Sequence, residues 1–284
     1  SQTGGDTDVG AIRGQLFNAD GSKSGDEFLV NTTTTSEQAL PAVTALTDGR
    51  FVVAWSDWSK ADGSNDPNAV RLQVFNTDGT KSGTEQLVNT THWASGGGDG
   101  GSVLVDGYDH VIDIAPLPNG GFVVTWSDNF SFRDGIWDNS GTSVQARIYG
   151  SNGLPVGDRF LVNSNYNDDQ NKPAVTGLTS GRVVVVWTDY TDSGSADGSG
   201  EVKGQIFNAN GTKYGGEFRV NSTTSFTQWE PAIAGLTTGG FVVVWTDWSG
   251  EGVDDNGGAV RAQLYSSTGS KVGGEFVVNT TTSD

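Results

Sequence analysis

The chain contains no cysteine and no methionine among its 284 residues. The absence of cysteine excludes a disulfide-stapled scaffold and a thiol nucleophile, but it leaves the cellular compartment open because many exported proteins also lack cysteine. No uninterrupted apolar run approaches the roughly 18 residues that a membrane-spanning helix needs. We therefore expect no insertion into a membrane.

Positive charge is also scarce. The chain has 16 Lys and Arg residues against 34 Asp and Glu residues, for a formal net charge of −18, and its isoelectric point is near 4.2. Such a surface repels phosphate backbones and anionic lipid headgroups, so we expect no nucleic-acid partner. The same surface suits a protein that binds cations.

Glycine and tryptophan are abundant, with 42 and nine residues, and the chain repeats four strand-like patterns. Pattern A is typified by VRLQVF (70–75), B by EQLVN (85–89), C by PAVTAL (41–46) and D by RFVVAW (50–55). Self-similarity at a fixed period outweighs any reading of single elements. The sequence therefore predicts a repeat architecture of short β-strands.

The repeat spacing supports a four-stranded unit. Gln15 and Gln73 are 58 residues apart, and the spacing stretches to 74 between Gln73 and Arg147. Glycine-bearing turns join C to D and A to B, as antiparallel hairpins require. The C strands carry small side chains, which suits a position at the crowded central axis. The D strands are apolar on both faces, which suits a position between neighbouring sheets, and the half-polar B strands suit a solvent-exposed edge.

These patterns predict an all-β fold, a β-propeller of four-stranded antiparallel blades. A β-solenoid, a pair of β-sandwiches and a five-bladed ring are the structural alternatives. The prediction treats residues 1–284 as a single repeat domain that comprises an extra N-terminal hairpin at 11–31 and complete blades at 41–89, 111–163, 173–221 and 231–279.

The loops from D to A and the crossovers from B to C are predicted to emerge on one face. Two of them, residues 90–110 and 127–143, depart from the repeat period and carry aromatic residues beside polar ones. Aromatic rings that stack on sugars, with polar groups nearby, are typical of glycan sites, although the same residues could pack the long loops together. The candidate ligand-binding residues are Trp58, His92, Trp93, Tyr108, Arg133, Trp137, Tyr190, Trp229 and Trp248.

Oxygen-rich side chains also cluster in the D-to-A loops. Calcium takes six to eight oxygen ligands at loose geometry, so these loops predict calcium as a cofactor. The alternative is that a carboxylate just after strand D accepts backbone N–H bonds and orders its loop. The candidate metal ligands are Asp57, Asp62, Asp66, Asp128, Asp134, Asp138, Asp189, Asp192, Asp197, Asp247, Asp254 and Asp255.

The combined pattern has a counterpart in a known group of proteins. The stretch GGFVVVWTD (239–247) and the segment 202–224 resemble repeat modules of very large secreted or surface proteins of bacteria, which are often found with hemolysin-type calcium-binding repeats. This resemblance implies an extracellular or cell-surface location, a calcium-rich setting and a role in adhesion or glycan binding. The chain departs from the pattern at 92–110, and the nonapeptide calcium repeat itself is absent.

Three functions remain open at this point. The main interpretation is a non-enzymatic, lectin-like module that binds a glycan or cell-surface polysaccharide with the help of calcium, next to neighbouring repeats of a longer array. The first alternative is a glycan-cleaving enzyme, a hydrolase or lyase with paired carboxylates on the same face. The second is a purely structural repeat of a large surface protein. No residue is assigned a catalytic role.

Overall fold

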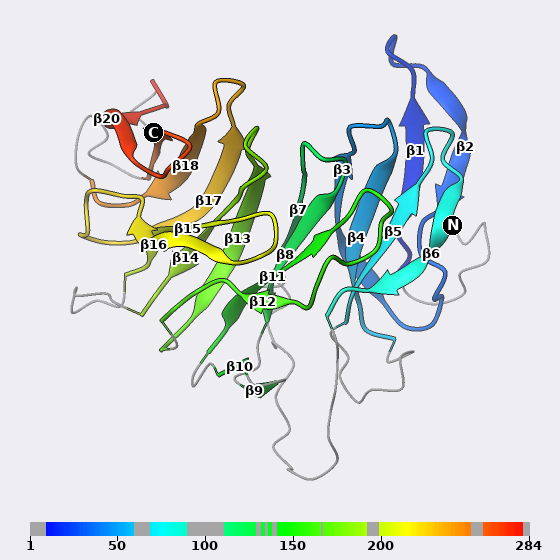
Figure 1. Ribbon diagram of the computed structural model, residues 1–284, viewed down its shortest axis with the longest axis horizontal. Coiled ribbons are helices and arrows are strands. Elements are labelled where there is room, and N and C mark those ends of the chain that lie inside the picture. The colour runs from blue at the N-terminus through cyan, green and yellow to red at the C-terminus, as the bar shows by residue number, and fades with distance from the viewer. Residues whose placement is uncertain are drawn as a thin grey trace. The chain divides into compact units, whose positions relative to one another are not determined.

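The computed structural model describes residues 10–59, 69–89, 111–128, 132–133, 136–137, 141–165, 167–191, 199–250 and 258–280. Within these ranges every regular element is a β-strand, as Figure 1 shows. In this part of the chain there is no helix long and apolar enough to cross a membrane. The chain forms two compact units, Ser1–Val105 and Asp106–Asp284, which we call unit 1 and unit 2.

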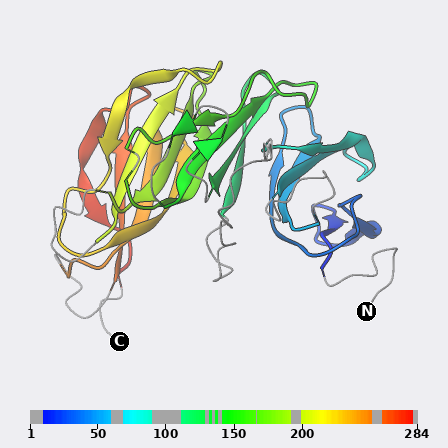
Figure 2. The same ribbon diagram turned by 90° about the horizontal axis from the view of Figure 1, so that it is seen from below.

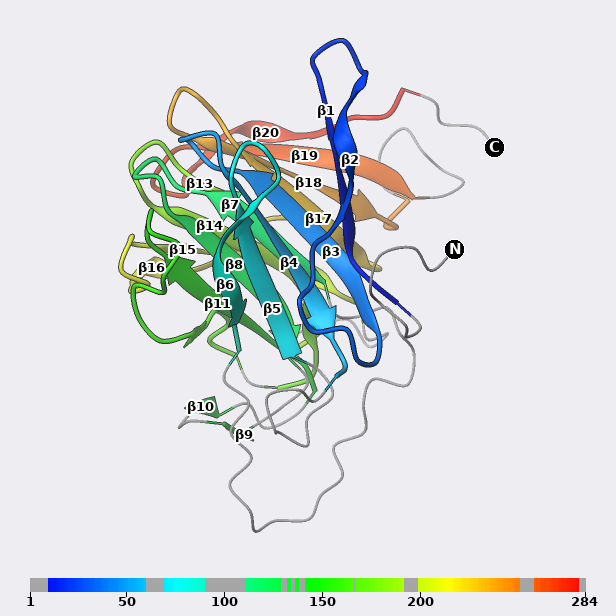
Figure 3. The same cartoon turned by 90° about the vertical axis from the view of Figure 1, so that its right-hand side faces the viewer.

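Unit 1 contains a two-stranded hairpin and one complete four-stranded sheet, drawn in dark blue to cyan in Figure 3. The hairpin pairs β1 (Arg13–Phe17) with β2 (Lys23–Leu29). The sheet has the strand order β3-β4-β5-β6. Its strands are β3 (Gln38–Ala45), β4 (Phe51–Asp57), β5 (Ala69–Phe75) and β6 (Lys81–Leu87).

Unit 2 contains three four-stranded antiparallel sheets, drawn from green to red in Figure 2. A short hairpin, β9–β10, follows β8 along the chain. The strands are β7 (Ile112–Pro116), β8 (Phe122–Asp128), β9 (Phe132–Arg133), β10 (Ile136–Trp137), β11 (Ser143–Tyr149), β12 (Phe160–Leu161), β13 (Gln170–Gly177), β14 (Val183–Asp189), β15 (Glu201–Phe207), β16 (Lys213–Arg219), β17 (Gln228–Gly235), β18 (Phe241–Asp247), β19 (Ala259–Tyr265) and β20 (Lys271–Val277).

Each complete sheet runs in the order C, D, A, B, with strand C at one edge and strand B at the other. The predicted all-β fold, with four complete blades of β-propeller type and an extra N-terminal hairpin, is therefore confirmed. Strands C of unit 2 pack against one another, β13 lying against both β7 and β17. This arrangement places three C strands around one region of unit 2.

The D strands form the core, because they are apolar on both faces and lie between sheets. Their tryptophans Trp55, Trp126, Trp187 and Trp245 are at most 1% exposed. In unit 2, Val202 and Val220 pack against the next sheet's D strand at Val243 and Trp245. Burying one such side chain stabilises the fold by about 1.5–3 kcal/mol. The sheets are thus held together by the repeated apolar pattern that the sequence shows.

Strand C begins earlier than the sequence predicted. We expected it to start at the prolines Pro41, Pro173 and Pro231, but pairing begins three residues earlier, at the glutamines Gln38, Gln170 and Gln228. A β-bulge separates the two paired segments, for example between Ala39 and Ala42. Proline has no N–H for a ladder, so it sits in the bulge, where no ladder bond is needed.

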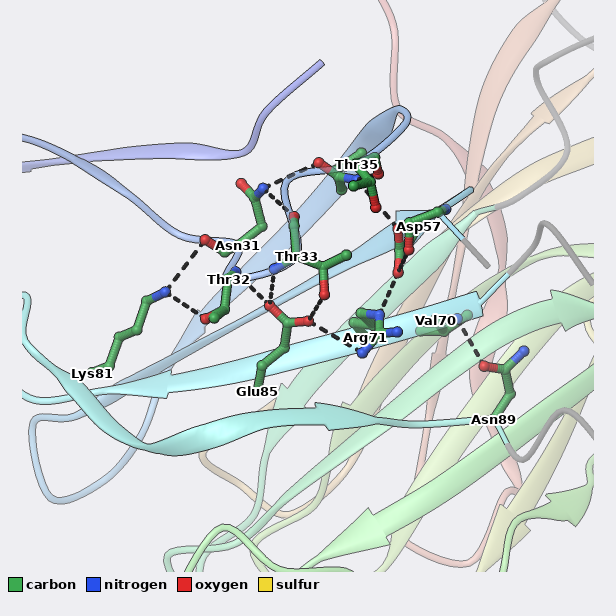
Figure 4. Close-up of polar contacts among 12 residues, drawn as sticks. Asn31, Thr32, Thr33, Thr35, Asp57, Val70, Arg71, Lys81, Glu85 and Asn89 are labelled. Carbon is green, nitrogen blue, oxygen red and sulfur yellow. Dashed lines mark hydrogen bonds and ion pairs between the residues drawn. The ribbon is translucent and has the colours of Figure 1, made fainter. Parts of the chain in front are cut away.

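A buried polar relay fixes the start of strand C, as Figure 4 shows for unit 1. Asn31 accepts the N–H of Ile12 at 2.9 Å and donates from Nδ2 to Gln38 Oε1 at 3.1 Å. Gln38 in turn donates from Nε2 to Asp57 Oδ1 at 3.2 Å. In unit 2, Asn221 donates from Nδ2 to Gln228 Oε1, and Gln228 donates from Nε2 to Asp247 Oδ1. The relay thus ties the end of strand B in one repeat to strands C and D of the next.

On three of the outer B strands, β6, β16 and β20, a lysine and a glutamate hold the preceding crossover. In unit 1, Lys81 donates to Thr32 Oγ1 at 2.8 Å, while Glu85 accepts the N–H of Thr32 at 2.6 Å and the hydroxyl of Thr33 at 2.9 Å (Figure 4). We call this lysine–glutamate pair the crossover clasp. Unit 2 repeats it with Lys213 and Glu217 on Ser164, and with Lys271 and Glu275 on Ser222.

Candidate functional site

A pocket of about 580 Å³ opens in unit 2 between the three C strands β7, β13 and β17. The three C strands are edge strands that pack against one another. They bring together residues from three successive repeats that are far apart in the sequence. Eight residues line it: Val111, Ile112, Asp113, Lys172, Pro173, Ala174, Glu230 and Pro231. Three of them carry charge, and none of the three was a predicted site residue.

Two of the charged residues stand at the β-bulge of strand C. Lys172 and Glu230 each precede the bulge proline and have positive φ angles of 51° and 53°. Leu40 holds the same position in unit 1, with φ of 54°. A non-glycine residue in this left-handed conformation is uncommon and strained, and such strain concentrates at functional sites. The bulge therefore re-aims one side chain in each of three sheets, and in unit 2 it supplies two charged residues of the pocket.

The third charged residue, Asp113, stands where the other repeats have alanine. Asp113 pairs with Thr125 of β8, at the position that Ala174 and Ala232 hold in the neighbouring sheets. Its Oδ1 accepts the N–H of Ile114 at 2.8 Å, and its Oδ2 accepts the N–H of Val175 at 2.8 Å. Both bonds come from backbone, so the carboxyl group is fixed in orientation.

Burial raises the pKa of the Asp113 carboxyl above its ordinary value, and the backbone hydrogen bonds from Val175 and Ile114 only partly oppose this effect. Desolvation disfavours the charged form of a carboxyl group, which explains the direction. The shift favours the protonated form of Asp113, the form that can donate a proton to a bound molecule.

Lys172 and Glu230 form an ion pair of 2.7 Å between Nζ and Oε1. The Lys172 side chain is 19% exposed and that of Glu230 is 52% exposed, so the pair stands where the pocket meets solvent. Lys172 Nζ also lies 4.2 Å from the ring centroid of Trp229, within cation–π range. Trp229 and Glu230 together hold the ammonium group in place, so the pocket contains a buried carboxyl group, a half-exposed carboxylate and a positive charge.

Sequence reasoning missed these three residues, although a signal was present. Residues 40, 111, 172 and 230 all differ in type, while the segments that follow them repeat closely as PAVTAL, PAVTGL and PAIAGL. Variation at one position inside a repeated frame is what a binding surface on a stable scaffold shows. The predicted ligand residues were chosen from the variable loops, and the variable position inside strand C was not considered.

The aromatic residues predicted to bind ligand are placed differently from one another. Trp229 supports Lys172 beside the pocket. Trp58 and Tyr190 are half-buried, and Trp248 is 50% exposed. Each of these three donates its backbone N–H to the crossover before strand C, for example Trp248 to Thr227 at 3.0 Å. The ring of Trp248 also lies over Gly258, where a Cβ would come within 3.1 Å of it.

The remaining predicted ligand residues are less well placed. His92, Trp93 and Tyr108 lie outside the described residues. Arg133 and Trp137 belong to the β9–β10 hairpin, of which only the backbone is described. Their part in ligand binding therefore stays a prediction.

Three of the predicted metal ligands, Asp57, Asp189 and Asp247, are buried and bonded to the protein itself. Asp57 pairs with Arg71, Asp189 with Lys203 at 3.2 Å, and Asp247 with Arg261. Each also accepts the N–H two residues later, at 2.8–2.9 Å, from Ser59, Thr191 and Ser249. Protein donors thus occupy the carboxylate oxygens that calcium would need.

The other predicted metal ligands cannot be placed in this way. Only the backbone of Asp128 is described, at the end of β8. The described ranges contain no group of three or more His, Cys, Asp and Glu side chains that could hold a metal. Calcium at the D-to-A loops stays a prediction. Outside the described residues lie Asp62, Asp66, Asp134, Asp138, Asp192, Asp197, Asp254 and Asp255.

No protein-family model and no curated protein matches the chain. Solved structures do match it in fold. A Dyadobacter fermentans protein of unknown function has a TM-score of 0.54 at 13% identity, covering 91% of this chain and 69% of that one. The GH93 α-L-arabinofuranosidase of Fusarium graminearum, solved with arabinobiose, has a TM-score of 0.53 at 12% identity, covering 85% and 66%.

A third match is the NanB sialidase from Streptococcus pneumoniae, with a TM-score of 0.51 at 8% identity, covering 89% of this chain and 53% of that one. At such identities the likeness shows the fold alone. This chain spans about two thirds of the Dyadobacter and Fusarium proteins and about half of the sialidase.

These matches correct the main interpretation of the sequence. The sequence favoured a non-enzymatic module for glycan binding and kept a glycan-cleaving enzyme as the alternative. That preference is wrong, because the matched structures of named activity are an arabinofuranosidase and a sialidase rather than binding modules. The calcium dependence stays a prediction. The physical reason for the error is that the charged pocket forms where three C strands from successive repeats converge. This convergence is not visible within any single repeat of the sequence.

Proposed function

We propose that the chain is a glycan-cleaving enzyme, a glycoside hydrolase that acts in the pocket of unit 2. The observation that carries the proposal is the pairing of two carboxyl groups with opposite surroundings in one pocket, Asp113 and Glu230. Glycoside hydrolysis uses two such groups, one that gives a proton and one that is charged. When two carboxyl groups in one site have different surroundings, those surroundings indicate which group acts as the acid and which as the base.

Asp113 takes the role of the acid. Burial raises its pKa and so favours the protonated carboxyl, which can give its proton to the glycosidic oxygen as the bond to the anomeric carbon breaks. The backbone N–H groups of Ile114 and Val175 fix the carboxyl and stabilise the carboxylate that remains. A water molecule can return the proton after the sugar has left.

Glu230 takes the role of the charged partner. Its ion pair with Lys172 keeps a carboxylate in the pocket, where it can accept a proton from an attacking water or attack the anomeric carbon itself. Lys172 in turn can donate a hydrogen bond to a sugar hydroxyl, because an ammonium group has three N–H donors. The ion pair thus places both a base and a sugar-binding donor at the mouth of the pocket.

The Fusarium enzyme, solved with arabinobiose, suggests the first substrates to try. We propose neutral glycans that contain arabinofuranose as the leading class, since a chain with a net charge of −18 repels acidic polysaccharides at long range. An extracellular or cell-surface setting, where such polymers occur, belongs to the same proposal.

The test is hydrolysis of a panel of aryl glycosides, led by the α-L-arabinofuranoside, together with arabinan, followed by released phenol and reducing ends. We expect turnover on at least one member, and a loss of roughly 10²–10⁴-fold in Asp113→Asn and Glu230→Gln. Asp158→Asn, which removes an exposed carboxylate outside the pocket, is the control and should keep full activity. A folded protein that turns over nothing in the panel, or keeps its activity in both pocket variants, contradicts the proposal.

A further inference from the structure

The last sheet of unit 2, β17–β20, exposes apolar residues that the other repeats bury. Val278 is 48% exposed, whereas its counterparts Val30, Val88, Val162 and Val220 are at most 1% exposed. Val260, its partner across the sheet, is 38% exposed, whereas Val70, Val144 and Val202 are at most 3% exposed. Elsewhere this valine pair packs against the D strand of the following sheet, as Val202 and Val220 do against Trp245.

An exposed phenylalanine lies on the same sheet. Phe276 of β20 is 46% exposed. Its counterparts pack against an aromatic ring on the A strand of the next repeat, with centroids 5.5 Å apart for Phe28 and Phe75, 4.9 Å for Phe160 and Phe207, and 5.3 Å for Phe218 and Tyr265. The same contact recurs in both units, so Phe276 presents half of a defined aromatic pair.

The other half of such a pair is exposed on the N-terminal hairpin. Phe17 of β1 is 62% exposed. By strand register it corresponds to Phe75, Phe207 and Tyr265, which are at most 2% exposed. In the other repeats the ring at this position packs against a phenylalanine equivalent to Phe28. In the hairpin the same ring is exposed to solvent.

The hairpin also carries the residues of a crossover clasp. Lys23 and Glu27 on β2 stand in the register of Lys81 and Glu85, and both are exposed. The clasp elsewhere holds the Thr or Ser that follows the asparagine of strand B, such as Thr32 or Ser222. The exposed Thr280, directly after Asn279, is the residue of that type at the end of the last sheet.

We propose that the exposed face of the sheet β17–β20 binds the N-terminal hairpin of a second copy of this chain. The contact continues the interface that already joins consecutive repeats, with Phe276 against Phe17 of the second copy, and Thr280 within reach of its Lys23 and Glu27. Two separate sets of residues are complementary between the two surfaces: the apolar pair Phe276 and Phe17, and the polar clasp of Lys23 and Glu27 with Thr280. Because two different surfaces meet, the contact is heterologous and propagates head to tail.

Crosslinking tests the pairing directly, because the chain contains no cysteine. Lys23→Cys and Thr280→Cys, which leave the Phe17–Phe276 pair intact, are made as separate proteins, mixed in equal amounts and treated with a short bismaleimide. The mixture should give a covalent dimer at least about tenfold more abundant than either protein gives alone, since a hot-spot contact holds the two positions together. Equal yields from the mixture and from the single proteins overturn the proposal.

Sedimentation velocity tests the association itself. The average mass should rise with protein concentration, and should rise further with added salt, because copies with a net charge of −18 repel each other at long range. Phe276→Asp should shift the association to at least about tenfold higher concentration, as loss of a buried aromatic contact does at interfaces. Glu27→Gln should weaken it to a smaller extent.

The matched control is Val156→Asp, which places the same charge at an apolar residue that is 59% exposed but lies outside the face. This variant should associate like the unchanged protein. A mass that stays monomeric at every concentration and salt level overturns the proposal, as does an equal loss of association in Val156→Asp and Phe276→Asp. The readout is independent of glycan cleavage, so the two proposals succeed or fail separately.

Discussion

Two sets of carboxylates lie near the ends of inner strands and have opposite surroundings. Asp57, Asp189 and Asp247 end their D strands with side chains at most 1% exposed, each against a lysine or arginine. Asp113 and Glu230 belong to C strands and line an open pocket. The first set is satisfied by the protein, whereas the second faces a space that a ligand can fill.

The comparison shows that the number of acidic residues in a region does not identify its function. The aspartates that end the D strands were among the candidate metal ligands because oxygen-rich side chains cluster in the loops that they begin. In the structure, three of them are internal ion pairs that order the start of a loop. The protein supplies donors to both sets, so what separates them is that Asp113 and Glu230 also line an open pocket, whereas the first set is closed off from solvent.

The largest expected effect comes from breaking a buried pair. Asp189→Ala leaves the Lys203 ammonium, whose side chain is 14% exposed, without its counterion. Removing one partner of a buried pair costs about 3–5 kcal/mol. Urea unfolding should show that loss in the free energy of unfolding. A loss no greater than that of Asp158→Asn would show that the two sets of carboxylates do not differ as described.

Interrupting the polar relay should have the next largest effect. Gln170 is fully buried, accepts from Asn163 Nδ2 at 2.9 Å and donates to Thr191 Oγ1 at 2.8 Å. Gln170→Ala leaves these groups without that partner, which costs about 1–3 kcal/mol for a buried donor. Thermal unfolding measures the effect. Thr179→Ala, an exposed site in the same sheet, is the control and should change little.

The pocket ion pair should matter least to stability. Glu230 is half exposed, so Glu230→Gln should lower the free energy of unfolding by about 0–1 kcal/mol, as surface pairs do. The same variant should lose hydrolysis under the proposed function. Urea unfolding and the glycoside assay, run on one preparation, separate the two readouts. A stability loss as large as that of Asp189→Ala would place Glu230 with the structural set.

The pH dependence of stability gives the finest distinction. The pKa of Asp113 is raised in the folded state from its ordinary value of 3.8. Just above that value the folded chain holds the Asp113 proton and the unfolded chain does not, so the free energy of unfolding falls as the pH rises through the interval. The stability of the unchanged protein relative to Asp113→Asn should therefore decrease upward from about pH 3.8. Asp158→Asn should show no such trend, and a rising difference for Asp113→Asn would contradict the assignment.

The repeat made most of the fold predictable. Strand type followed from residues such as the D-strand valines. The glycine-bearing turns and the polarity of each strand type predicted the order C, D, A, B that each complete sheet adopts. The bulge was not predictable in the same way, because a proline after a strand-like segment marks either a start or an interruption. The register between strands C and D shows that the proline interrupts strand C. This register depends on the buried hydrogen bonds of Gln38, Gln170 and Gln228.

The candidate site was less predictable than the fold. Asp113 looked like part of an irregular C strand, VIDIAPL, and nothing in that segment alone shows that Lys172 and Glu230 from later repeats come near it. Spatial convergence of three C strands produced the pocket. Long loops with histidines and tryptophans were visible to pattern analysis, whereas a charge at one bulged position was not.

The left-handed residue before each C-strand proline has a consequence for how this chain tolerates change. Glycine would adopt the φ angles near 50° of Leu40, Lys172 and Glu230 without strain, so the present side chains are held at a conformational cost. The flanking pairs, such as Gln170 with Asp189 and Ala174 with Val186, keep the backbone in register whatever residue stands between them. Three of the four complete sheets thus have one place where a single substitution can change the chemistry without a change in the blade, and where selection for robustness alone would favour a residue with no side chain.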